Sequence, residues 1–121
     1  MHWIELKTLN QLEELMKESK KKTALIFKHS TQCSVSKTAL NRLERSWADN
    51  DNLLVTPYYL DLISYRTISN SIATTFDIEH QSPQVLIIEN GQSIYNSSHL
   101  DIDYRSIKAI LEKLKILSIK N

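Results

Sequence analysis

Two short apolar runs constrain the fold of this chain more than any other feature of its sequence. Residues 23–28 read Thr-Ala-Leu-Ile-Phe-Lys, and residues 85–88 read Val-Leu-Ile-Ile. A strand with one face in water alternates apolar and polar residues, whereas a continuous apolar run is typical of a strand that is buried on both faces. Each run is therefore predicted to be a strand of a sheet that is covered on both sides.

The segments around these runs predict amphipathic helices and further strands. Apolar residues recur at helical spacing after Thr8, a residue that favours the N-cap position. The same patterns predict strands over 2–6, 53–60 and 93–95, and helices from 34 to about 48, from 65 to 76 and from about 101 onward. Pro57 cannot donate to a ladder, so the strand over 53–60 is expected to bend, to bulge or to be shorter.

The order of these elements predicts the topology of one domain over residues 1–121. Helices between the early strands favour right-handed crossovers and parallel pairing. Asn90-Gly91 is a strong hairpin signal, so the last two strands should be antiparallel. The predicted fold class is α/β, with the order β-α-β-α-β-α-β-β-α, a mixed central sheet and helices on both faces. This order resembles the thioredoxin arrangement, so we expect a thioredoxin-like fold.

Composition excludes several classes of protein. Lys plus Arg number 15 and Asp plus Glu number 14, a net charge of +1, so neither nucleic acid nor an anionic membrane is expected as a partner. The single cysteine allows no internal disulfide, which excludes the extracellular disulfide scaffolds. The N-terminal residues lack the apolar core of a signal peptide, and no stretch approaches the ~20 apolar residues of a membrane span. We expect a cytoplasmic protein.

The single cysteine, Cys33, lies between the end of the strand over 23–28 and the first turn of the next predicted helix. Backbone N–H groups in the first turn of a helix are unpaired, and the helix dipole adds a partial positive charge there. Both features stabilise a thiolate, which is the nucleophile in disulfide exchange. The position therefore predicts a reactive thiol.

A lone cysteine in a cytoplasmic protein is usually a small buried hydrophobe, which is the alternative for Cys33. Its polar neighbours favour the reactive interpretation; they are Ser30, Thr31, Gln32, Ser34 and Ser36. Ser36 stands three residues after Cys33, where dithiol oxidoreductases keep their second cysteine. A serine there can donate a hydrogen bond to a thiolate but cannot form a disulfide, so the predicted chemistry is monothiol. The alternative is that Ser36 is an ordinary residue of the first helical turn.

Four further residues are candidates for the site. Pro83 follows Ser82 just before the strand over 85–88, where thioredoxin folds carry a cis-proline beside the active cysteine, so we expect a cis bond. The backbone of Ser82 would then be able to pair with an extended substrate chain. His29 and His99 are candidate charge partners of Cys33, although a surface or loop histidine is the commoner case. No histidine spacing suggests a metal site with Cys33.

Two segments resemble the monothiol bacilliredoxins (YtxJ-like). Residues 28–36, Lys-His-Ser-Thr-Gln-Cys-Ser-Val-Ser, resemble the active-site stretch of that family, which has a Lys-His-Ser lead and then a Thr-x-Cys-Pro-Ile-Ser-like motif. Residues 80–86, His-Gln-Ser-Pro-Gln-Val-Leu, look like its cis-proline signature. Asn90-Gly91 and residues 96–99 are similar to its closing hairpin and the loop that follows. The resemblance spans nearly the whole chain.

The resemblance implies an enzyme that removes bacillithiol from protein mixed disulfides, with Cys33 as nucleophile and Pro83 as the substrate-side cis-proline. The motif neighbours of the nucleophile are Thr31, Gln32 and Ser36. Bacillithiol or a similar low-molecular-weight thiol would be the co-substrate, S-thiolated proteins would be the partners, and no bound cofactor is expected. Ser34 stands where the family commonly has proline. Compared with proline, the serine adds a hydroxyl and a backbone N–H near the sulfur.

Two other functions remain open from the sequence. The domain could be a redox-inactive binding or adaptor module in which Cys33 is incidental, and slow alkylation of Cys33 would favour this. It could also be a glutaredoxin-like iron–sulfur carrier. The usual motif for that role is Cys-Gly-Phe-Ser, and Ser34-Val35 lacks both the glycine and the aromatic residue. The thiol–disulfide oxidoreductase ranks first, the adaptor second and the carrier third.

Overall fold

The two apolar runs form neighbouring strands in the middle of a five-stranded sheet. In the computed structural model, which describes residues 1–120, these strands are β2 (Ala24–His29) and β4 (Gln84–Glu89). The strand order is β1-β3-β2-β4-β5, with β1 (Ile4–Glu5) and β5 (Gln92–Ser98) at the edges. β3 (Thr56–Asp61) pairs in parallel with β1 and β2, whereas β4 pairs antiparallel with β2 and β5. The predicted mixed sheet and closing hairpin are confirmed.

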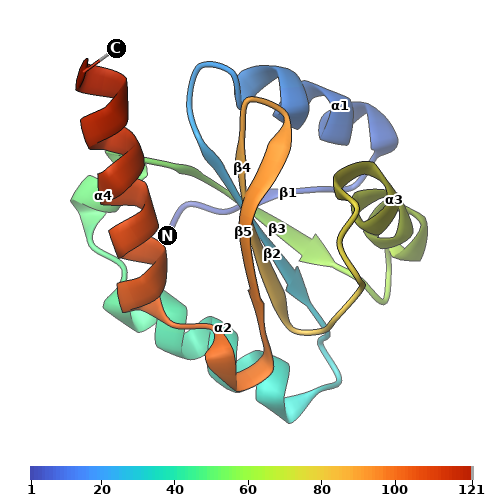
Figure 1. Ribbon diagram of the computed structural model, residues 1–121. Helices are drawn as coiled ribbons and strands as arrows, with labels where there is room; N and C mark the ends of the chain where they lie inside the picture. Colours follow the sequence, from blue (N-terminus) through green and yellow to red (C-terminus); the bar gives the residue numbers. More distant parts are fainter. Residues whose placement is uncertain (121) are drawn as a thin grey trace.

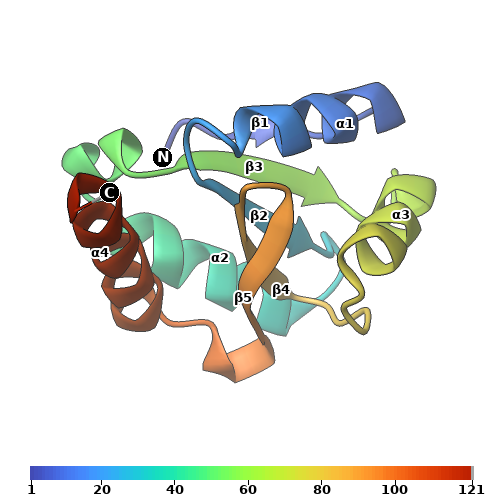
Figure 2. The same cartoon turned by 45° about the horizontal axis from the view of Figure 1, so that its top comes forward.

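Four helices cover the two faces of this sheet (Figures 1 and 2). α1 (Leu9–Glu18) and α3 (Arg66–Phe76) lie on one face, and α2 (Ser34–Ser46) and α4 (Tyr104–Lys120) lie on the other. Thr8 caps α1 as predicted, because its hydroxyl accepts the N–H of Gln11 at 3.1 Å. Among the residues that the structure describes, no helix has both the length and the apolar character needed to cross a membrane.

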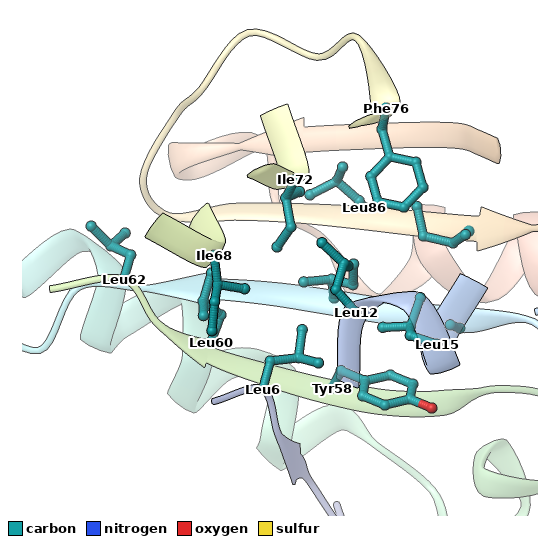
Figure 3. Packing of buried hydrophobic residues seen from close by; sticks show 13 residues of the cluster. Leu6, Leu12, Leu15, Tyr58, Leu60, Leu62, Ile68, Ile72, Phe76 and Leu86 are labelled. Carbon is teal, nitrogen blue, oxygen red and sulfur yellow. The ribbon is translucent and has the colours of Figure 1, made fainter. Parts of the chain in front are cut away.

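Alternate side chains of β2 enter two separate hydrophobic clusters. Ala24 and Ile26 pack in the cluster beneath α1 and α3, part of which is shown in Figure 3. Leu25 and Phe27 pack in the cluster beneath α2 and α4. All four are at most 1% exposed, which explains why the run shows no alternation in its sequence. The last two residues of the strand continue this alternation and bring polar side chains to opposite faces of the sheet.

The strand predicted over 53–60 begins later than expected. The chain first forms a 3-10 turn over Asp49–Leu53, and β3 starts only at Thr56. A carboxylate holds this turn, because Asp51 accepts the backbone N–H of Ala48 at 2.9 Å. The segment of Asp and Asn residues predicted as a simple break therefore has defined structure of its own.

Pro57 lies inside β3 without disturbing its hydrogen bonds. The N–H of Thr56 donates to the carbonyl of Thr23 on the β2 side, at 2.9 Å. Successive residues of a strand alternate in direction, so the missing N–H of Pro57 faces the β1 side. Pairing with β1 begins one residue later, at Tyr58 opposite Ile4. The proline therefore occupies the one side of the strand where no donor is required at that point.

The remaining boundaries differ from the sequence expectation by a few residues. α2 ends at Ser46 rather than near 48, and β5 extends beyond the predicted 93–95 in both directions. A short 3-10 turn over His99–Asp101 precedes α4, which starts at Tyr104. These are differences of element ends, which sequence patterns define least well.

Candidate active site

Cys33 is the N-cap residue of α2. Its carbonyl accepts the N–H of Lys37 at 3.1 Å, the first hydrogen bond of the helix, and its own N–H donates to the carbonyl of Ser30 at 3.2 Å. The side chain makes no capping hydrogen bond, and the first turn of α2 contains no acidic residue. The partial positive charge of this helix end is thus not neutralised within its own turn, and it lies beside the sulfur.

The side chain of Cys33 is partly exposed in an open cleft of about 490 Å³. The cleft is lined by Ser30, Gln32, Cys33, Leu62, Ile63, Arg66, His80 and Ser82. These residues come from the loop after β2, the β3–α3 connection, the start of α3 and the loop before β4. A somewhat larger hollow of about 570 Å³ lies at the 20–22 turn and α4, but its lining contains neither cysteine nor histidine. The chemistry therefore points to the Cys33 cleft.

The loop before β4 brings a cis-proline to this cleft. The Ser82–Pro83 peptide bond is cis, which confirms the prediction. Ser82 lines the cleft with Cys33, and Pro83 is buried, with its carbonyl accepting the N–H of His99 at 3.0 Å. Within the described residues, the buried hydroxyl oxygen of Ser82 has no hydrogen-bond partner. Pairing of the Ser82 backbone with a substrate chain stays a prediction.

A buried histidine–serine pair supports the loop that carries Cys33. Nδ1 of His29 lies 2.7 Å from Oγ of Ser36, and the same oxygen accepts the N–H of Ser30 at 3.0 Å. His29 is only 5% exposed and Ser36 is fully buried. The hydroxyl of Ser36 thus links the first turn of α2 to His29 at the end of β2 and to Ser30 in the following loop. These residues flank the segment that holds Cys33.

This pair changes the roles expected of its members. Burial lowers the pKa of His29 below its ordinary value, so the ring is neutral at pH 7. A neutral ring hydrogen-bonded to Ser36 positions the loop rather than acting as a charge partner of Cys33. With Ser36 engaged by His29 and Ser30, its predicted hydrogen bond to the thiolate stays a prediction.

The other predicted residues lie around the sulfur at different depths. Gln32 is exposed and lines the cleft, and Thr31 and Ser34 are exposed without belonging to the lining. His99 is exposed and also outside the lining, with a left-handed backbone at φ 53°. The structure therefore relates His99 to the site through its backbone hydrogen bond to the cis-proline and not through its ring.

Sequence reasoning missed a group of basic side chains at the cleft, of which His80 and Arg66 line it and Lys28 is buried. Nζ of Lys28 lies 2.8 Å from Nδ1 of His80, and Arg66 lines the cleft beside that ring. Burial lowers the pKa of Lys28 from 10.5 to about 8. Burial also lowers the pKa of His80, and the positive charges of Lys28 and Arg66 lower it further. The available signal was a lysine at the end of an otherwise apolar strand.

Solved structures with the same arrangement are thioredoxin-fold proteins. A thioredoxin-fold protein provisionally described as an oxidoreductase shares 29% identity at a TM-score of 0.75, covering 90% of this chain and 92% of that one. Thioredoxin of Fasciola hepatica has 14% identity and a TM-score of 0.70, over 90% and 96% of the two chains. Malassezia sympodialis thioredoxin has 17% identity and a TM-score of 0.69, over 90% and 87%. The fold and the N-cap cysteine define a thioredoxin-fold thiol–disulfide oxidoreductase.

The family follows from the sequence match. Residues 4–107 match the model of the family described as monothiol bacilliredoxin BrxC, and the chain belongs to this family. The α/β thioredoxin-like fold predicted from the order of elements is confirmed, and so is the family resemblance drawn from the two active-site segments. With one cysteine in the chain, thiol–disulfide redox chemistry here is monothiol.

Proposed function

We propose that this protein removes bacillithiol, or a similar low-molecular-weight thiol, from mixed disulfides on client proteins. The thiolate of Cys33 attacks the sulfur of the small thiol. A new disulfide forms between that sulfur and Cys33, the old disulfide breaks, and its electron pair leaves on the client sulfur. The client recovers its thiol, and the small thiol remains on Cys33.

The second half of the reaction needs an outside thiol, which is the co-substrate. The residue one turn after Cys33 is Ser36, which has no sulfur and cannot displace the small thiol. A second low-molecular-weight thiol attacks the mixed disulfide, leaves as the symmetric disulfide of the two small thiols, and releases the Cys33 thiolate. The protein therefore shuttles one thiol group per cycle and requires no bound cofactor.

The single observation that carries this proposal is the position of Cys33 at the N-terminus of α2, open to a cleft that Ser82 also lines. The thiolate is the attacking species in disulfide exchange, and the sulfur lies at a helix start whose first turn contains no acidic residue. The family to which the chain belongs supports the choice of bacillithiol as the small thiol.

Intact-mass spectrometry tests the proposal. The reduced protein is mixed with a model protein that carries one bacillithiol mixed disulfide, and both masses are followed with time. The expected result is that the mass of bacillithiol moves from the model protein to the wild type and does not move to Cys33→Ala. Addition of free bacillithiol should then return the wild type to its reduced mass.

Parallel reactions with glutathione and coenzyme A mixed disulfides define which small thiol the cleft accepts. Asn10→Ala, a change at an exposed position of α1 outside the cleft lining, is the matched control for handling and folding. If wild type accepts none of the three thiols, the enzyme proposal is wrong, and a redox-inactive adaptor becomes the better account.

A further inference from the structure

Lys28 is the least expected residue in the interior of this protein. Its side chain is fully buried at the end of β2, on the face of the sheet that α3 covers. A buried ammonium without a carboxylate partner is costly, and such groups are rare in structural roles. Among the described residues, its hydrogen-bond partner is Nδ1 of His80, at 2.8 Å. Such an arrangement needs an explanation beyond packing.

The surroundings of the ammonium are polar but nearly free of negative charge. On the neighbouring strands it stands opposite Leu60 of β3 and Gln84 of β4. The amide of Gln84 donates to the carbonyl of Glu79, and its oxygen has no partner among the described residues. From α3, Ser69 places its hydroxyl 3.4 Å from the His80 ring. The other charge that acts on the ring is Arg66, which is also positive. Within the described part of the chain, no carboxylate pairs with the ammonium.

The hydrogen bond fixes which nitrogen of His80 carries the proton. An ammonium has three N–H donors and no lone pair, so Nδ1 must accept from Lys28. In the neutral ring the proton then resides on Nε2. His80 lines the same cleft as Cys33, so the N–H donor at Nε2 belongs to a residue of the candidate site. The side chains of Lys28 and His80 therefore connect a buried acid to the reaction cleft.

We propose that Lys28 and His80 form a proton relay that protonates the client sulfur as Cys33 displaces it. This inference rests on the function proposed above and adds the acid for its first step. The electron pair of the broken disulfide stays on the client sulfur, which takes the proton from Nε2 of His80. Nδ1 takes a proton from Lys28 in the same event.

The products of this step balance. They are the mixed disulfide on Cys33, a neutral client thiol, an uncharged amine at Lys28 and a ring of His80 that carries its proton on Nδ1. After the client leaves, a solvent proton at Nε2 and return of the Nδ1 proton to Lys28 restore the starting state. A departing thiolate and the ammonium have similar proton affinities, because burial lowers the pKa of Lys28 to about 8 and a free thiol titrates near 8.5.

The test compares two leaving groups on the same small thiol. One mixed disulfide joins the thiol to an aliphatic cysteine, whose thiolate is strongly basic, and the other joins it to 2-nitro-5-thiobenzoate, an aromatic thiolate that leaves without a proton. Rates of transfer to Cys33 are measured for wild type, Lys28→Met and His80→Gln. The expected result is that the ratio of aliphatic to aromatic rate falls at least about tenfold in both variants, the size of one lost hydrogen bond to a charged group.

The matched control is Ile26→Met, at a buried position on the same face of β2, two residues before Lys28. It should keep the wild-type ratio. Alkylation of Cys33 by iodoacetamide reports whether each variant keeps its fold and its reactive sulfur. His80→Gln changes a half-buried ring and keeps the result interpretable if Lys28→Met fails to fold.

The outcomes separate the two proposals. An unchanged ratio in both variants, with wild type active, overturns the relay and leaves the proposed function intact. An equal loss with both leaving groups also overturns the relay, and assigns the two residues to binding of the small thiol. If wild type accepts the small thiol from neither mixed disulfide, the proposed function itself is wrong, and the relay is wrong with it.

Discussion

Replacing Lys28 with methionine should make this protein more stable at neutral pH. Burial lowers the pKa of Lys28 from 10.5 to about 8, and the side chain is 0% exposed. The difference between these values means that keeping the ammonium charged inside the folded protein costs about 3 kcal/mol at pH 7. Methionine has a similar length and no charge, so it removes this cost. It also removes the hydrogen bond to His80, worth about 1 kcal/mol, which leaves a net gain of about 2 kcal/mol.

The pH dependence of the gain identifies its cause. Between pH 8 and pH 10.5 the unfolded chain binds more protons at Lys28 than the folded protein does, so wild-type stability rises with pH through this window. Lys28→Met lacks this rise, and its advantage should shrink by about 2 kcal/mol between pH 7 and pH 9.5. Tyrosines with raised pKa values, Tyr58 and Tyr59 among them, are common to both proteins and cancel in the difference.

Urea unfolding at pH 7 and pH 9.5, followed by tryptophan fluorescence, measures these free energies directly. Ile26→Met is again the control, because it changes packing on the same face and introduces no titrating group. Its stability difference from wild type should be the same at both pH values. If Lys28→Met is less stable than wild type at pH 7, or if its difference does not change with pH, the account of a buried, charged lysine is wrong.

Two further substitutions probe other buried polar groups. Ser36→Ala leaves Nδ1 of His29 without its partner and should cost about 2 kcal/mol; thermal unfolding measures this, and an unchanged midpoint would contradict the positioning role. Burial raises the pKa of Asp51, but hydrogen bonds from Lys108 and Tyr104 outweigh it and hold the pKa below the usual value. Asp51→Asn should therefore lose about 2 kcal/mol at pH 7. Because the stability from such a carboxylate is lost as pH falls through the folded pKa, wild type and Asp51→Asn should converge below pH 3.8 in acid titrations of unfolding; a constant gap would refute this.

Much of the fold could be predicted because local patterns and long-range structure agree. The apolar runs became β2 and β4, Asn90-Gly91 became the hairpin between β4 and β5, and Thr8 became a cap. The strand predicted over 53–60 starts too early compared with β3, because a string of Asp and Asn residues signals a turn without showing that Asp51 is buried. That burial depends on Lys108, which lies 57 residues later on α4.

The candidate site divides in the same way. The location of its cysteine could be predicted because the position of Cys33 between a strand and a helix is a local property. The proximity of Cys33 and Ser82 could be predicted only with the resemblance to a known family, since no pattern in the 48 residues between them indicates it. The roles of His29 and Ser36 were not visible at all, because both residues fit a polar loop as well as they fit a buried pair.

The sequence by itself determined the order of strands and helices and the place of the single cysteine at a helix start, because each depends on residues within a few positions of one another. Only the tertiary structure decided that Lys28 would meet His80, 52 residues further along the chain. The physical reason is that β2 is buried on both faces, so its sequence carries no period that says which side chain faces which helix. The antiparallel pairing of β2 with β4 sets that register, and it brings the loop before β4 to the end of β2, where His80 lines the same cleft as Cys33 and contacts the buried lysine.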